Sequence, residues 1–202
     1  MSNNKSILDP CCGSRMFWFD PKNPNVIFAD NRLVDTTLCD GRHLVVEPDM
    51  EIDFRGMPFP DNTFNLVVFD PPHLIHAGES SWLAKKYGVL PKDWKPYLRE
   101  GFMECLRVLK HTHTLIMKWN TEQISPPEML SAIGYRPLFG DQRGKTRWLV
   151  FIKEDINKKK VERKVLVTYN CLKICTYKLI SLSERKKGGM SALFCLEKEN
   201  QN

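Results

Sequence analysis

Three short apolar runs in the first 70 residues of the chain each end on an aspartate. They cover residues 6–9, 26–30 and 64–70, and a weaker run of the same kind covers residues 51–54. Runs of this length, bounded by turn residues and separated by longer segments, are typical of buried strands joined by crossover connections. The pattern therefore predicts an α/β protein built on a mostly parallel sheet.

The alternation of strands and helices continues through the next 80 residues. Apolar residues recur at spacings of three and four between residues 94 and 109, which predicts an amphipathic helix. Ser125 in the cap position, proline in the first turn and Gly134 as a stop predict a shorter helix over residues 126–133. Three further strands complete a predicted sheet of seven, at residues 113–118, 135–139 and 146–153.

Bulk composition narrows the class of protein. A chain with 42% hydrophobic and 27% charged residues has the balance of one soluble globular domain with an appendage. No apolar run approaches the roughly 20 residues that a membrane span needs, and the first five residues form no apolar signal core. We therefore expect a cytoplasmic protein with no membrane partner.

The cysteines and histidines do not suggest a metal site. Seven cysteines, an odd number without regular spacing, fit buried reduced thiols better than a disulfide framework. Cys171 and Cys175 are a near pair, but no second pair or nearby histidine accompanies them. His73 and His76 follow two prolines, which disfavour the regular helix that would bring both rings to one metal. We expect no metal.

The positive charge is unevenly distributed. The formal net charge is +6, but residues 1–153 hold 19 Lys and Arg against 18 Asp and Glu, whereas residues 154–202 hold 11 against 6. We therefore expect two parts, a near-neutral domain over residues 1–153 and a basic C-terminal extension over residues 154–202. If the extension binds phosphate, removing it should weaken nucleic-acid affinity and its dependence on salt.

Two sequence features suggest a ligand site at the strand ends. The turn Asp9-Pro-Cys-Cys-Gly-Ser14 follows the first strand, where glycine lets the backbone approach a ligand in an open α/β sheet. Asp30 follows 21 residues after Asp9, near the spacing at which such folds place a carboxylate on ribose hydroxyls. Each feature also has a purely structural interpretation, as a turn and as a helix cap.

A third feature, the polar stretch before the strongest strand, spans residues 53–64. Asp53 could accept a hydrogen bond from an exocyclic amine such as that of adenine, with Phe54 or Met57 packing on the ring. The alternative is an ordinary surface loop.

The most specific feature is Asp70-Pro71-Pro72-His73, directly after the strongest strand. The two prolines restrict the backbone and remove two amide donors, so the Asp70 carboxylate and the Pro71 carbonyl remain as acceptors. Such a pair suits an NH₂ group. His73 could stack its flat ring on a planar base.

Together these motifs resemble a known family. Asp-Pro-x-x-Gly-Ser at the first strand and Asp-Pro-Pro followed by a ring residue at the fourth are similar to the class I, AdoMet-dependent amino-methyltransferases of the adenine-N6 type. The resemblance covers residues 5–153 and implies a Rossmann-like class I methyltransferase fold, with a seven-stranded, mostly parallel sheet and flanking helices. It also implies S-adenosyl-L-methionine (AdoMet) as the cofactor.

The resemblance implies a role for each motif residue. Asp30 would hold the ribose of AdoMet, while Asp53, with Phe54, would hold its adenine. Two residues depart from the family pattern, Arg15 in place of a glycine and His73 in place of Tyr, Phe or Trp. The remaining implied site residues are Asp9, Pro10, Cys11 and Gly13 at the methionine end of AdoMet, and Asp70, Pro71, Pro72 and His73 in the catalytic loop.

The expected activity is methyl transfer to an exocyclic amine, adenine N6 in nucleic acid, with DNA favoured over RNA. A segment with Trp82, Lys85, Lys86 and Tyr87 carries base-stacking and phosphate-binding residue types, although a solvated helix would look the same. A cytosine-C5 enzyme is rejected, because its cysteine nucleophile is expected after the fourth strand, where this chain has Asp-Pro-Pro. A small-molecule or protein-glutamine methyltransferase, or a non-catalytic module, stays open, as does the oligomeric state.

Overall fold

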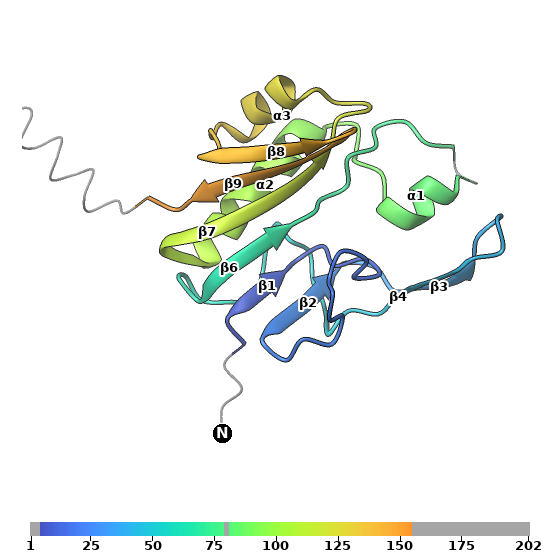
Figure 1. Ribbon diagram of the computed structural model, residues 1–202, viewed down its shortest axis with the longest axis horizontal. Helices are drawn as coiled ribbons and strands as arrows, with labels where there is room; N and C mark the ends of the chain where they lie inside the picture. Colours follow the sequence, from blue (N-terminus) through green and yellow to red (C-terminus); the bar gives the residue numbers. More distant parts are fainter. Residues whose placement is uncertain (1–4, 79–80, 155–202) are drawn as a thin grey trace, which may run out of the picture. The chain divides into compact units, whose positions relative to one another are not determined.

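A computed structural model of the chain describes residues 5–78 and 81–154. It contains one large sheet whose seven strands follow the order β5-β2-β1-β6-β7-β9-β8 (Figure 1). The strands of this sheet are β1 (Ile7–Asp9), β2 (Val26–Asp30), β5 (Met50–Glu51), β6 (Phe64–Phe69), β7 (Leu109–Asn120), β8 (Phe139–Arg143) and β9 (Thr146–Ile152).

In this sheet the neighbouring strands from β5 through β2, β1 and β6 to β7 are parallel, and β9 is antiparallel to β7. Strand β9 lies between β7 and β8, and it pairs antiparallel with both. The chain therefore starts in the middle of the sheet, moves to one edge, returns and crosses to the other edge. This is the Rossmann-like, seven-stranded, mostly parallel arrangement that the motifs imply, so the predicted fold class is confirmed.

Helices α2 (Trp94–Val108) and α3 (Pro126–Ile133) pack against each other, and α2 packs on β6 and β7. The main apolar core lies here and contains Phe69, Phe102 and Trp119. Gly101 is required within α2, because a Cβ at this position would collide with the Phe54 ring. Both helices were predicted, and α3 has the predicted cap: Ser125 accepts a hydrogen bond from the Glu128 amide, and Gly134 ends the helix in the left-handed conformation.

Two local features differ from the predictions. The strand expected at residues 135–139 is β8, displaced toward the C-terminus because the turn-like residues 140–143 pair with β9. A hairpin of β3 (Val34–Thr37) and β4 (His43–Val46) was not predicted. It forms a separate small sheet that projects from the main one (Figure 1).

The segment that carries Trp82 and Tyr87 is helical, as α1 (Trp82–Tyr87). Trp82 packs against a small apolar cluster within the β3–β4 hairpin. None of the described helices is long and apolar enough to cross a membrane. The extension predicted for residues 154–202 lies outside the described residues, apart from Glu154.

Candidate active site

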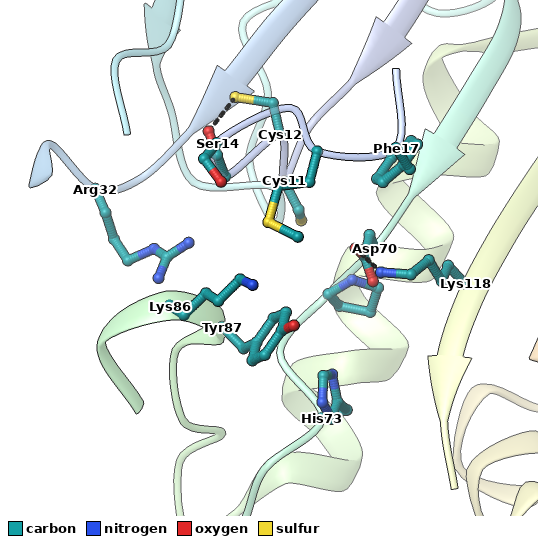
Figure 2. A pocket seen from close by; sticks show the side chains of 13 residues that line it. Cys11, Cys12, Ser14, Phe17, Arg32, Asp70, His73, Lys86, Tyr87 and Lys118 are labelled. Carbon is teal, nitrogen blue, oxygen red and sulfur yellow. Dashed lines mark hydrogen bonds and ion pairs between the residues drawn. The ribbon is translucent and has the colours of Figure 1, made fainter. Parts of the chain in front are cut away.

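A cavity of about 220 Å³ lies beyond the carboxyl ends of β1 and β6. Figure 2 shows Arg32 and Lys86 pointing into it from one side, with Asp70 and Lys118 on the other. Of the predicted site residues, those that line the cavity are Cys11, Gly13, Asp70, Pro71 and His73. Those that do not line it are Asp9, Pro10, Asp30, Asp53, Phe54 and Pro72.

Asp70 forms an ion pair with Lys118, which lies near the end of β7. The parallel register pairs Phe69 with Met117, so the next residues of the two strands, Asp70 and Lys118, are neighbours. Lys118 Nζ lies 2.6 Å from Asp70 Oδ2, and both side chains are mostly buried. Burial raises the pKa of Asp70, while the charge and hydrogen bond of Lys118 act to lower it. Among the described residues, none donates a hydrogen bond to Asp70 Oδ1.

His73 is buried at the edge of the same cavity. Its ring centroid lies 5.3 Å from that of Tyr87 and 6.5 Å from that of Trp119. Burial first, and then the positive charge of Lys118, lower the pKa of His73 to about 4. A hydrogen bond with the Pro71 backbone acts in the opposite direction. His73 is therefore a neutral, flat ring at neutral pH.

The turn after β1 is held together by Asp9, which is fully buried. Its carboxylate accepts hydrogen bonds from the Trp18 indole at 2.8 Å and from the Cys11 amide at 3.2 Å. Burial raises the pKa of Asp9 to about 7 despite these donors. Asp9 thus faces the protein interior and shapes the turn.

Both cysteines of this turn are protonated thiols. Burial raises the pKa of Cys12 to about 12 and that of Cys11 well above its usual value. Neither sulfur is therefore an activated nucleophile, which agrees with the rejection of cytosine-C5 chemistry.

Arg15, the departure from the family's glycine, adopts a left-handed backbone with φ 56°. This conformation explains why glycine suits the position. The Arg15 guanidinium donates hydrogen bonds to the backbone carbonyls of Pro21 and Glu47 and lies 4.2 Å from the Phe28 ring centroid. These contacts hold the turn in a conformation that a β-carbon disfavours.

Asp30, at the end of β2, is nearly completely buried, and both of its carboxylate oxygens accept hydrogen bonds. Oδ2 accepts from the Gly13 amide at 3.0 Å, and both oxygens accept from the Arg32 guanidinium at 3.0 and 3.2 Å. Asp30 therefore ties the turn after β1 to β2. The group that reaches the cavity from β2 is Arg32, which sequence reasoning missed.

Asp53 and Phe54 lie apart from the cavity. Arg55 binds the exposed Asp53 carboxylate at 2.6 Å and lowers its pKa. The Phe54 ring is in the core, edge-on to the rings of Phe69 and Tyr97. Their predicted contact with adenine stays a prediction.

Aromatic and basic side chains also line the cavity. Phe17 and Tyr87 are part of its wall, and the Phe17 ring centroid lies 5.4 Å from Lys118 Nζ. Lys86 also lines the cavity, and its Nζ lies 5.1 Å from the Tyr87 ring centroid. Within the described residues, no cluster of three or more His, Cys, Asp or Glu side chains could hold a metal ion.

Among the residues that line the cavity, those not predicted from the sequence are Met16, Phe17, Arg32 and Lys118. Lys118 carried a usable signal, since it is a charged residue near the end of a predicted strand, next to Trp119. Trp119 itself is fully buried and donates a hydrogen bond to the Ile124 carbonyl. It belongs to the core.

No family model matches this chain, and no curated protein sequence matches it. Among solved structures, the PH0226 protein of Pyrococcus horikoshii is 15% identical, with a TM-score of 0.47 over 72% of this chain and 80% of that one. The T. thermophilus 16S rRNA methyltransferase RsmC, in complex with AdoMet and guanosine, is 14% identical, with a TM-score of 0.41 over 74% of this chain and 35% of that one.

The antibiotic-resistance methyltransferase Kmr is also 14% identical, with a TM-score of 0.39 over 74% of this chain and 89% of that one. Similarity at this level carries no conclusion about substrate. Any statement about activity therefore rests on the chain's own residues.

Proposed function

We propose that this chain is an AdoMet-dependent methyltransferase that methylates an exocyclic amine, adenine N6 in nucleic acid, with DNA favoured over RNA. The observation that carries the proposal is the place of Asp70 and Pro71. They lie at the carboxyl end of β6 and line one cavity together with Cys11 and Gly13 of the turn after β1. An acceptor site for an amine thus faces the place where an open α/β sheet binds a nucleotide-like ligand.

The turn after β1 is suited to a close ligand. Gly13 has φ 49°, and a Cβ at this position would meet open space, so the backbone is accessible from the cavity. The cavity, at about 220 Å³, is smaller than the roughly 300 Å³ typical of the smallest ligand pockets. A cofactor of nucleoside size therefore requires the flexible side chains of Arg32 and Lys86 to move outward. Arg32 must also leave Asp30 if that carboxylate is to bind the ribose.

The protein's task in the reaction is to orient the amine. When bound, AdoMet would supply a methyl group on a positively charged sulfur, which the amine lone pair would take as the carbon–sulfur bond breaks. The positive charge then lies on nitrogen, which releases one proton to water. Asp70 Oδ1 and the Pro71 carbonyl accept hydrogen bonds from the two N–H groups and favour the pyramidal amine. Most of the rate enhancement would come from this positioning.

The neutral ring of His73 supports a flat, uncharged substrate. A neutral imidazole next to Tyr87 can pack on a planar base without presenting a charge to it. The proximity of His73 does not prevent Pro71 from acting as an acceptor, because a carbonyl oxygen has two lone pairs. A base in a duplex would first have to be flipped out, at a cost of a few kcal/mol.

A second candidate is methylation of an amine on a small molecule or a protein glutamine. The observation in its favour is charge, since residues 1–153 carry 19 basic against 18 acidic residues. A duplex-binding surface normally has a clear basic excess.

We also propose a cytoplasmic location, because the described cysteines are all free thiols.

The test is incubation with tritiated AdoMet and separate pools of DNA, RNA, protein and small-molecule cell extract, followed by nucleoside analysis of the nucleic acids. Label in N6-methyladenine supports the proposal, and comparison of the DNA and RNA pools distinguishes the two nucleic acids. Label confined to protein or to a small molecule favours the second candidate. Absence of label from every pool, in a protein that binds AdoMet by calorimetry, would contradict both.

A further inference from the structure

Asp70 is held at one oxygen only. Lys118 Nζ lies 2.6 Å from Oδ2, whereas Oδ1 accepts no hydrogen bond from any residue in the described part of the chain. The side chains of Lys118 and Asp70 are 22% and 16% exposed, so little water is available to replace this contact. The single contact therefore sets the rotation of the carboxylate as well as its charge.

The position of Lys118 is determined by the sheet. Its backbone belongs to β7, whose pairing with β6 aligns Met117 with Phe69. Its ammonium also lies 5.4 Å from the Phe17 ring centroid, close enough for a cation–π contact. Lys118 is thus held between a strand neighbour and an aromatic ring, which is a more restricted position than that of a surface lysine.

We propose that Lys118 is a positioning residue for methyl transfer, holding Asp70 by Oδ2 so that an ionised Oδ1 faces the cavity as the acceptor for the substrate amine. The inference rests on the proposed function. Without the ammonium, a carboxyl group this buried would gain a proton more readily. A protonated carboxyl is a donor as well as an acceptor, and its rotation would no longer be fixed.

Other groups around the cavity must be considered in any titration. The pKa of Asp70 responds to burial and to Lys118, while Asp70 itself contributes to the raised pKa of Asp9 and of Cys11. Glu122 acts on His73. The remaining charged or titratable side chains that line the cavity are Cys12, Arg32, Lys86 and Tyr87.

The experiment compares the full-length wild type with Lys118→Met, Lys118→Arg and Lys145→Met. Lys145 is a matched control, because its Nζ also lies 2.6 Å from a carboxylate, that of Glu122, but the pair is exposed. The primary readout is ¹³C NMR titration of the aspartate carboxyl carbons, with the Asp70 signal assigned from Asp70→Asn. Circular dichroism checks that each variant is folded.

In Lys118→Met we expect Asp70 to titrate about 1 to 3 pH units higher, the usual effect of losing an adjacent cation. Lys118→Arg should restore most of the wild-type titration, and Lys145→Met should match the wild type. Equal titration of Asp70 in the wild type and in Lys118→Met would overturn the inference. If methionine prevents folding, Lys118→Gln removes the same charge with a polar side chain, and an unshifted titration of Asp70 in that variant would likewise overturn the inference.

The second readout is the pH dependence of kcat for methyl transfer. The acid limb in Lys118→Met should move upward with Asp70, with kcat at pH 7 at least about tenfold lower and the Kd for AdoMet unchanged. If Asp70 titrates at higher pH in Lys118→Met but the wild type methylates nothing, the proposed function fails and the Lys118–Asp70 coupling stands. If methyl transfer occurs with an unshifted acid limb, the inference fails and the proposed function stands.

Discussion

Asp30 and Asp70 are the same residue type at equivalent ends of two parallel strands, yet their surroundings differ. Both are paired with a basic side chain, Arg32 for Asp30 and Lys118 for Asp70. Asp30 also accepts from the Gly13 and Arg32 amides, so both of its oxygens are used. Asp70 retains one oxygen without a partner among the described residues. The difference supports the proposed division of roles, in which Asp30 organises the site and Asp70 accepts the substrate amine.

A local motif underlies part of this contrast. Arg32, Arg42 and Arg55 each bind the aspartate two residues earlier through both the backbone amide and the guanidinium. The Asp40–Arg42 pair is exposed, whereas Asp30 is 3% exposed and also holds Gly13. Asp40 is therefore a matched control for Asp30.

The largest expected effect is that of Asp70→Asn. Losing the ionised acceptor should lower kcat by about 100- to 1,000-fold, comparable to the loss of one preorganised polar group in other active sites, while AdoMet binding is retained. Radiolabel transfer measures the rate, and calorimetry measures binding. Asp61→Asn, an exposed and ion-paired control, should keep full activity. Wild-type kcat in Asp70→Asn would contradict the assignment.

The second prediction concerns pH and His73. The pKa of His73 is about 4 in the folded protein against 6.5 in an exposed histidine. Between these pH values the unfolded chain binds a proton at His73 that the folded chain does not. The His73 contribution to the free energy of unfolding is therefore complete above pH 6.5 and is lost as pH falls toward 4. The full loss is on the order of 3 kcal/mol.

Urea denaturation of the wild type and His73→Phe at several pH values measures this effect. Asp9, with a pKa raised to about 7, titrates in the same range with the opposite sign. Subtracting the free energy of unfolding of His73→Phe from that of the wild type cancels the contribution of Asp9 and leaves that of His73. If this difference in free energy is the same at pH 7.5 and at pH 4, His73 is not buried as a neutral ring.

Asp30→Asn should act on the cofactor rather than on chemistry. Loss of the carboxylate weakens the tie to Gly13 and removes the proposed ribose acceptor, so the Kd for AdoMet should rise by about tenfold to 100-fold, roughly 1–3 kcal/mol. At saturating AdoMet, kcat should stay within a few-fold of the wild type. Asp40→Asn should leave Kd unchanged. An Asp30 variant with normal Kd but low kcat would reverse the division of roles between Asp30 and Asp70.

The smallest expected effect is that of Arg32→Met. If Arg32 competes with the ribose for Asp30, its removal should lower the Kd for AdoMet by a few-fold, equivalent to about 1 kcal/mol or less. Calorimetry against the Arg42→Met control measures the difference. A higher Kd would instead mean that the guanidinium itself contacts the cofactor.

Local signals predicted the local structure of this chain well. Helix α3 matches its predicted range because a cap, a first-turn proline and a terminal glycine are all contained in its own sequence. Strand β8 was displaced because its turn-like residues, such as Gly140, form a strand only through pairing with β9. The hairpin was missed because its strands are four residues each and only partly buried.

In the candidate site, too, some features follow from local sequence and others from contacts between distant residues. The order of residues along the chain is enough to place aspartates at the ends of three apolar runs and two prolines after Asp70. Which carboxylate keeps an oxygen without a partner among the described residues depends on the tertiary structure. Lys118 lies 48 residues from Asp70, and Gly13 lies 17 from Asp30. Strand register and chain path bring these donors together, and neither is encoded in a local pattern.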